Sequence, residues 1–175
     1  MSGLAQPSVA PAGSRALMRD LGASAYAIVI LLLTSIGVGA AGRRGILIPV
    51  AVPFALVLIV ALRRLRPSAE RWAWALFTLW LGSTYLQSGG AVERVILAGY
   101  GALALAGVLL NPWFLVAAWV AHPLWDLVPH SLPPVLKDLP TACLGFDWVI
   151  AAYLVTVAYR RRAQPQISRA GHASS

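Results

Sequence analysis

The chain has 175 residues, of which 59% are hydrophobic and only 11% are charged, and its mean hydropathy is +0.73. A soluble domain carries about 25% charged residues, so this composition excludes an ordinary water-soluble globular protein. The formal charge of +8 does not indicate nucleic-acid binding, because the basic residues lie between apolar runs and the sequence has no polar domain to carry a basic face.

Six apolar runs of near-spanning length follow one another along the chain, which predicts an all-α bundle of six transmembrane helices. They cover residues 21–41, 46–62, 72–88, 94–110, 113–128 and 142–159. The first run is too long for the core of a cleaved signal peptide, so we interpret it as a span. Residues 21–162 are therefore expected to form the transmembrane domain, and residues 1–20 and 163–175 are expected to be disordered cytoplasmic tails.

The distribution of basic residues predicts the orientation of these spans. Ten of the 14 Lys and Arg residues fall in the two terminal segments and in the loop after the second run. Loops on the cytoplasmic side are enriched in Lys and Arg. Both termini are therefore predicted to lie in the cytoplasm, with the protein a multi-pass component of a cell membrane, here a bacterial inner membrane.

The fifth run carries His122, Asp126 and His130 at four-residue spacing, with Pro123 and Pro129 in the same turns. Ionisable side chains inside an apolar span cost roughly 2.5–3.5 kcal/mol each or more and by default indicate a functional site. A His and a carboxylate one helical turn apart can share a divalent ion. We therefore expect His122, Asp126 and His130 to be candidate ligands of a divalent metal such as zinc, on a helix that the prolines kink or partly unwind.

Other polar side chains are expected at the same depth of the membrane. Counting at about 1.5 Å per residue places His122 near the midplane and Asp126 one turn further out. In the sixth run, Asp147 also falls in the outer half. We expect His122, Asp126 and Asp147 to be the candidate catalytic residues, since a carboxylate orients a neighbouring imidazole and raises its basicity. An alternative is that Asp147 caps the start of the sixth helix.

Three aromatic residues are expected near this cluster because the predicted topology also places them in the outer half of the bilayer. They are the candidate substrate-binding residues Tyr85, Tyr100 and Trp125. Aromatic side chains of this kind also serve as packing and interfacial residues in membrane proteins.

Two resemblances follow from the motif. The His122-x-x-x-Asp126 spacing resembles the helical element of membrane-embedded zinc hydrolases of the ceramidase and adiponectin-receptor type. That resemblance covers only these two residues, and the chain lacks the seventh span and the separate H-x-x-x-H element of those families. The string His-Pro-Leu-Trp-Asp, with the second His, the Pro-rich loop, Cys143 and Asp147, is similar to a group of small bacterial multi-pass membrane proteins. It extends over about residues 119–150 and implies no particular activity.

Three functions are consistent with these patterns. The first is an intramembrane enzyme that uses a metal or acid/base chemistry on a lipid-soluble or amphipathic small molecule. The second is a small transporter or accessory subunit that uses the same residues as an ion or proton relay and forms a homo-oligomer. The third is a structural membrane protein in which the His and Asp residues only hold helices together. The lipid bilayer is the expected partner in all three.

Overall fold

The computed structural model describes residues 12–88, 90–129 and 131–173, and its side chains are described between residues 21 and 160 except at 88, 89 and 130. All regular structure in these residues is helical, which confirms the predicted all-α class. The α-helices of the described residues are α1 (Ala12–Arg43), α2 (Leu47–Leu62), α3 (Pro67–Ser83), α4 (Ala91–Leu109), α5 (Pro112–Asp126) and α6 (Leu139–Ala173). Two short 3-10 helices, η1 (Thr84–Ser88) and η2 (Pro134–Leu136), lie in the connections.

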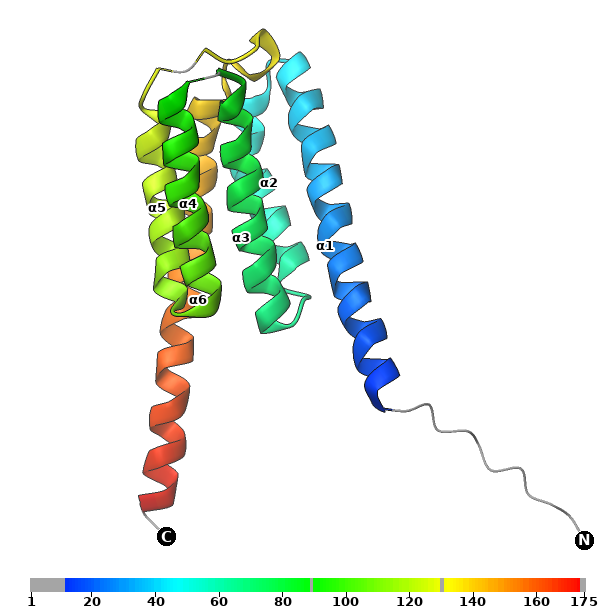
Figure 1. The fold of residues 1–175 in the computed structure, drawn as a ribbon, viewed down its shortest axis with the longest axis vertical. Helices are drawn as coiled ribbons and strands as arrows, with labels where there is room; N and C mark the ends of the chain where they lie inside the picture. Colours follow the sequence, from blue (N-terminus) through cyan, green and yellow to red (C-terminus); the bar gives the residue numbers. More distant parts are fainter. Residues whose placement is uncertain (1–11, 89, 130, 174–175) are drawn as a thin grey trace, which may run out of the picture.

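Helices α2 to α6 form a bundle, and α1 leans against one side of it (Figure 1). Helix α6 packs against both α2 and α5, and α4 packs between α3 and α5. Among the described residues, the main contacts of helix α1 are with α2, α3 and η2. The start of α1 and the end of α6 lie at the same end of the bundle, and the α5–α6 connection lies at the opposite end (Figure 1).

Several helices begin at residues whose backbone suits a helix start. Pro67 and Pro112 occupy the first turns of α3 and α5, where the missing N–H of proline costs nothing. The Asn111 side chain caps α5 by accepting a hydrogen bond from the backbone N–H of Trp113 at 3.1 Å, which satisfies one of the free donors of the helix start. Gly45 has a φ of 65°, a conformation that glycine adopts at no steric cost, and it turns the chain between α1 and α2.

The largest differences between the helix ends and the predicted boundaries are at the starts of α1 and α3 and at the end of α6. Helix α3 begins at Pro67 and not at residue 72, because the charged stretch after Pro67 belongs to its first turn. Residues 12–20 and 163–173, expected to be disordered, continue α1 and α6. These segments contain Ala, Leu, Arg and Gln, which have high helix propensity. The rest of the predicted tails, residues 1–11 and 174–175, lies outside the described residues.

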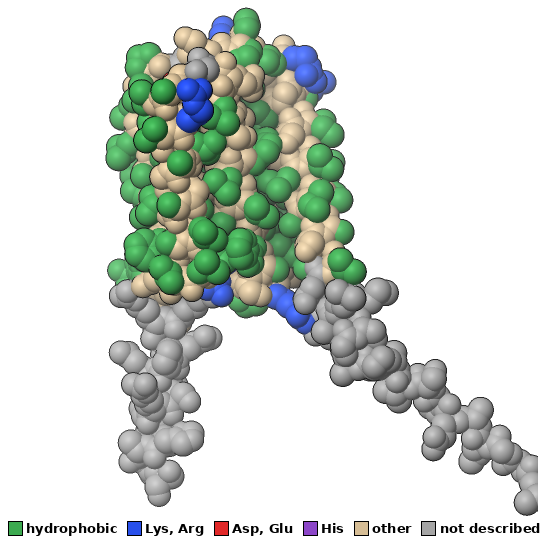
Figure 2. Space-filling model, in the orientation of Figure 1, with side chains coloured by type: hydrophobic (Ala, Val, Ile, Leu, Met, Phe, Trp, Pro, Cys, Tyr) green, Lys and Arg blue, Asp and Glu red, His purple; other side chains and the backbone are tan. Residues whose placement is uncertain are grey.

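Three helical segments of the described chain are long and apolar enough to cross a membrane, namely Leu21–Arg43, Ala91–Leu109 and Pro134–Arg160. A shorter apolar helix spans Leu47–Leu62. Large apolar side chains are exposed along the bundle, for example Leu33 at 59% and Val95 at 72%. Figure 2 shows apolar side chains along the side of the bundle and Lys and Arg near its two ends. Apolar surface of this extent marks a membrane or partner interface.

The centre of the bundle is aromatic. Phe77 of α3 stacks on Trp119 of α5 with ring centroids 5.9 Å apart, and Trp74 meets Trp119 edge to face at 5.8 Å. Phe146 of α6 lies 5.7 Å from Phe77. Such pairs contribute about 0.5–1.5 kcal/mol each beyond their burial. This aromatic layer fixes α3, α5 and α6 relative to one another, and these are the helices that carry the polar side chains described next.

Candidate functional site

Helices α5 and α6 bring three polar side chains together near the end of the bundle that holds their connection. His122 and Asp126 lie one turn apart at the end of α5, and Asp147 lies in the third turn of α6. Pro123 sits inside α5 without ending it. A residue and the fourth after it share a helix face, so both α5 side chains are directed toward α6, against which α5 packs.

The three side chains meet at one nitrogen. His122 Nδ1 lies 2.8 Å from Asp147 Oδ2 and 3.3 Å from Asp126 Oδ2. The first distance is that of a hydrogen bond, while the second is longer than the usual range. All three residues are buried, with His122 1% exposed, Asp147 0% and Asp126 8%. One ligand atom from each lies within 4.8 Å of the others. We call these three residues the His–Asp cluster.

An aromatic wall encloses the His–Asp cluster. Tyr85, at the start of η1, is fully buried and donates its hydroxyl proton to Asp126 Oδ1. The ring of Tyr100 on α4 lies edge-on to His122 with centroids 5.4 Å apart, and Trp125 lies 5.8 Å from His122. Tyr85, Tyr100 and Trp125, the three predicted substrate-binding residues, thus surround the imidazole, although their role toward a substrate stays a prediction.

Three buried polar atoms of the His–Asp cluster have no hydrogen-bond partner among the described residues. They are His122 Nε2, Asp126 Oδ2 and Asp147 Oδ1. A buried donor or acceptor left unsatisfied costs about 1–3 kcal/mol, and more when it is charged. A network that served only to join α5 and α6 would be more stable with these atoms paired. The cluster therefore has free bonding capacity for a group that the protein itself does not supply.

The charge of the His–Asp cluster is unbalanced. Two carboxylates face one imidazole, and no described Lys or Arg side chain forms an ion pair with either carboxylate. Burying carboxylates without compensating charge is strongly unfavourable. A nitrogen donor with two carboxylate oxygens is a ligand set that first-row divalent metals accept. A divalent cation would balance both carboxylates, so the three residues suit a metal ion by both charge and donor type.

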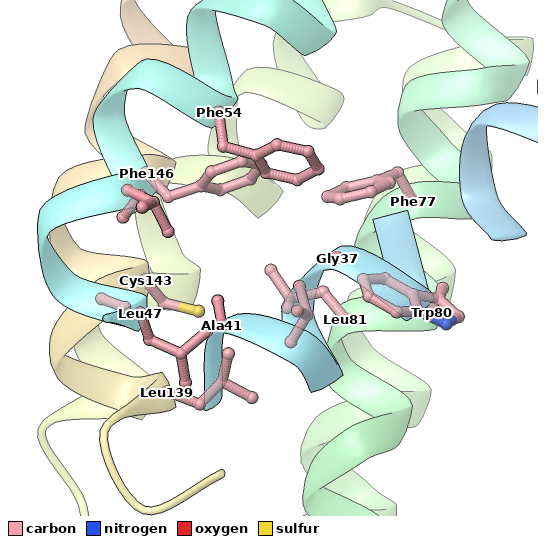
Figure 3. A pocket seen from close by; sticks show the side chains of 14 residues that line it. Gly37, Ala41, Leu47, Phe54, Phe77, Trp80, Leu81, Leu139, Cys143 and Phe146 are labelled. Atoms are coloured by element: carbon pink, nitrogen blue, oxygen red, sulfur yellow. The ribbon is translucent and has the colours of Figure 1, made fainter. Parts of the chain in front are cut away.

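An apolar cavity of about 130 Å³ lies one turn of α6 away from the cluster residue Asp147. Its walls come from α1, α2, α3 and α6, and Figure 3 shows Phe54, Phe77 and Phe146 at one side and the Cys143 sulfur directed into it. Cys143 precedes Asp147 by one turn of α6, and Leu81, also in the wall, precedes Tyr85 by four residues. One helical turn thus separates the cavity from the cluster residue Asp147 on α6 and from Tyr85, which donates to the cluster residue Asp126. We call it the apolar cavity below.

The bounds of α5 and α6 differ from two expectations drawn from the sequence. The alternative that Asp147 caps the sixth helix is wrong, because α6 begins at Leu139 and no acidic residue lies in its first turn. The helical face predicted to join His122, Asp126 and His130 ends early, since α5 stops at Asp126 and Pro129 follows in non-helical backbone. His130 lies outside the described residues, so its predicted role as a ligand stays a prediction.

Sequence reasoning missed a third buried acid, Glu70, in the first turn of α3. Its side chain accepts a hydrogen bond from Tyr153 Oη of α6, and Trp74 Nε1 donates to it at 3.4 Å. Glu70 is only 9% exposed. In the sequence it lies in the charged stretch before the predicted third span, which resembles a loop. Only the packing of α6 against α3 reveals its burial, because the tyrosine donor is 83 residues away.

A protein-family model matches residues 45–160 of the chain. The chain belongs to DUF6010, a family of unknown function. The matched DUF6010 region contains α2 to α5, most of the bundle portion of α6 and every residue of the His–Asp cluster, but it leaves out α1. No curated protein and no solved structure matches the chain.

Proposed function

We propose that this protein is a six-span membrane protein with both termini in the cytoplasm, in which His122, Asp126 and Asp147 bind a divalent metal ion. The metal would serve chemistry on a lipid-soluble or amphipathic substrate in the outer half of the bilayer. The observation that carries the proposal is the meeting of two buried carboxylates at His122 Nδ1, at 2.8 and 3.3 Å, with no basic side chain paired to them among the described residues.

The membrane placement rests on three features of the bundle. The described residues include three long apolar helices, large apolar side chains lie exposed along the bundle, and α1 begins at the same end at which α6 ends. Because ten of 14 basic residues lie at that end, we place it in the cytoplasm. The His–Asp cluster then lies in the outer half of the membrane.

A metal at the His–Asp cluster would polarise a substrate oxygen or generate a hydroxide nucleophile from bound water. His122 and the carboxylates would hold the ion, and the Tyr85 hydroxyl would orient Asp126, as partners of metal ligands commonly do. The apolar cavity one turn away would take the hydrocarbon part of the substrate. Its wall of Phe, Leu, Val and Ala side chains suits such a group and offers almost no polar contact.

A proton or ion relay through the bundle receives less support. The His–Asp cluster and Glu70 lie toward opposite ends of the bundle, because Glu70 is in the first turn of α3 and the cluster lies near the α5–α6 connection. Between them lie Trp74, Phe77 and Trp119, which are all buried at 2% exposure or less. Ions and protons cross membranes along polar or hydrated paths, and this aromatic layer offers none among its described side chains.

Metal analysis of the protein purified in detergent tests the proposal directly. The wild type, exposed to Zn²⁺, Mn²⁺ and Fe²⁺ in turn and then freed of loose metal, is expected to retain about one ion per chain, and His122→Ala, Asp126→Asn and Asp147→Asn are expected to retain little. Removing a ligand weakens binding by at least the 10–100-fold that loss of a supporting partner alone causes.

Asp138→Asn serves as the matched control, because it removes the same charge from the residue just before α6 and is expected to leave metal content unchanged. Metal content that is nil in the wild type with every ion, or equal in the wild type and all three cluster variants, would contradict the proposal.

A further inference from the structure

A second cavity opens at the opposite end of the bundle from the α5–α6 connection, between the α2–α3 turn and α6. Its volume is about 490 Å³. The polar and charged side chains that line it are Arg63, Glu70, Tyr153, Thr156 and Arg160. This composition differs from that of the apolar cavity, whose described walls carry no charged side chain. We call it the basic cavity.

Two arginines from different elements face the basic cavity. Arg63 follows the last residue of α2 and Arg160 lies on α6. Neither forms an ion pair with a described acid. The carboxylate of Glu70 accepts hydrogen bonds from Tyr153 and Trp74 and brings one negative charge to the lining, against the two positive charges of the arginines. The guanidinium groups therefore remain available, and their planar donor geometry matches the oxygens of a phosphate group.

The start of α3 adds to the positive character of the same cavity. Pro67, which lines it, is in the first turn of α3. The dipole of a helix favours negative charge at its N-terminal end. Leu65 and Val157 provide apolar lining beside the polar groups. The cavity thus combines a basic wall with an apolar edge, as the headgroup region of a phospholipid requires.

We propose that the basic cavity binds the phosphate of an anionic phospholipid headgroup, with Arg63 and Arg160 as the direct ligands. The choice of a lipid over free phosphate rests on the membrane placement proposed above, which sets this cavity at the cytoplasmic edge of the apolar belt. Basic pockets between helices on that side of a membrane recognise acidic headgroups. The site is separate from the His–Asp cluster and needs no metal.

Native mass spectrometry of the delipidated full-length protein tests this site. Phosphatidylglycerol, phosphatidylcholine and inorganic phosphate are titrated separately into the wild type and into the double variant Arg63→Gln/Arg160→Gln. We expect phosphatidylglycerol to bind the wild type at least tenfold more tightly than it binds the double variant, and more tightly than phosphatidylcholine binds the wild type. Inorganic phosphate is expected neither to bind nor to compete.

The matched control is Arg43→Gln/Arg44→Gln, which removes two arginines at the other end of the bundle. It is expected to bind phosphatidylglycerol as the wild type does. Equal affinity of the Arg63/Arg160 double variant and the wild type for phosphatidylglycerol would overturn the proposal. Arginine-dependent binding of inorganic phosphate with an affinity equal to that of the lipid would support the phosphate site and overturn the lipid as its source.

The metal content of the same samples separates this proposal from the function proposed above. Arg63 and Arg160 are exposed at the surface, so their substitution is expected to leave the fold and the His–Asp cluster intact. A double variant that keeps its metal and loses phosphatidylglycerol supports the lipid site. A wild type that binds the lipid but no metal would reject the metal proposal and leave the lipid site standing.

Discussion

His122 presents Nδ1 to two carboxylates, while its Nε2 has no hydrogen-bond partner among the described residues. Tyr85 in turn fixes Asp126 through its hydroxyl. The orientation of the imidazole is therefore set from α6 and η1 as well as from its own helix. When neutral, a His held in this way has a defined tautomer with the proton on Nδ1. When a metal binds at Nδ1, the imidazole gives up that proton.

Tyr85→Phe tests whether the hydrogen bond from the Tyr85 hydroxyl to Asp126 contributes to metal binding. The substitution removes the hydroxyl that donates to Asp126 Oδ1 and keeps the ring. We expect the metal dissociation constant to rise about 10–100-fold, as it does when a partner of a metal ligand is lost, with the helix content unchanged by circular dichroism. Tyr100→Phe is the matched control, because the Tyr100 hydroxyl has no hydrogen bond among the described residues and its ring contacts with His122 and Trp125 are kept. Equal metal affinity in both variants would contradict a role for the Tyr85 hydroxyl.

His122 and Asp147 are expected to be coupled in stability even without metal. In the presence of a chelator, we expect the double variant His122→Ala/Asp147→Asn to lose free energy of unfolding. We expect this loss to be smaller than the sum of the losses caused by the two single substitutions. The difference should be about 0.5–3 kcal/mol, because residues in direct contact are not additive. Denaturant unfolding in detergent micelles measures it.

The pair His122→Ala with Asp138→Asn provides the comparison. Asp138 precedes Asp147 by nine residues, or about 13 Å along a helix, so this pair is expected to be additive within about 0.5 kcal/mol. Additivity in both pairs would mean that the 2.8 Å contact contributes nothing to stability.

The residues of the candidate site differ in how far the sequence could predict them. The four-residue spacing of His122 and Asp126 is visible in the sequence, and the alternation of spans predicts that Asp147 and Tyr85 lie at the same depth. Which carboxylate contacts which nitrogen depends on the packing of α5 on α6. The burial of Glu70 also depends on tertiary packing, since its donor Tyr153 comes from another helix.

At the scale of helices, the close contact of α4 and α5 holds the His–Asp cluster against its aromatic wall. Gly107 of α4 permits this approach. A Cβ atom at Gly107 would lie 2.5 Å from Leu115 Cβ and 2.6 Å from the Leu115 backbone nitrogen. Contacts with backbone at that distance cannot be relieved by a side-chain movement, so α4 and α5 would have to separate.

Gly107→Ala is therefore expected to destabilise the protein by about 1–3 kcal/mol, the usual cost of overpacking, and to lower its melting temperature in detergent. Gly99→Ala on the same helix is the control. A Cβ there meets nothing within 4 Å, and alanine has a helix propensity about 1 kcal/mol better than glycine, so this variant should be unchanged or slightly more stable. The opposite order of melting temperatures would contradict the packing of α4 on α5.

The helices themselves were predictable from the apolar runs, but their ends were less so. Hydropathy gives the apolar part of a helix, whereas a helix start depends on backbone geometry. The start of α3 at Pro67 was missed because Pro67 is followed by Ser, Glu and Arg, which resemble a loop in composition. The end of α5 at Asp126 follows from Pro129, which disfavours helical backbone in the residue before it.

For the molecule as a whole, Figure 1 shows which of the connections between helices lie at the same end of the bundle. The α2–α3 turn lies at the end with the start of α1, and the α5–α6 connection lies at the other. The proposed orientation therefore predicts opposite accessibility for these two connections in intact cells. It also places the basic cavity and the His–Asp cluster toward opposite faces of the membrane.

Single-cysteine labelling in a Cys143→Ser background measures this accessibility. We expect a cysteine at Ser131, in the α5–α6 connection, to react with a membrane-impermeant maleimide added to intact cells. A cysteine at Ser68, near the start of α3, should react only after the membrane is permeabilised. The reverse result would invert the proposed orientation, and equal labelling of both sites in intact cells would contradict the spanning arrangement itself.

In the proposed six-span arrangement, the division of the His–Asp cluster between α5 and α6 bears on how the chain would enter the membrane during its synthesis. Helix α5 carries His122 and Asp126 but has only 15 residues, and its partner Asp147 is made later, beyond the connecting loop. A lone charged side chain at the middle of a bilayer helix costs about 2.5–3.5 kcal/mol. We therefore expect α5 to remain at the translocon until α6 has emerged, so that the two helices leave it sideways into the lipid together, as a hairpin whose polar groups are already in contact.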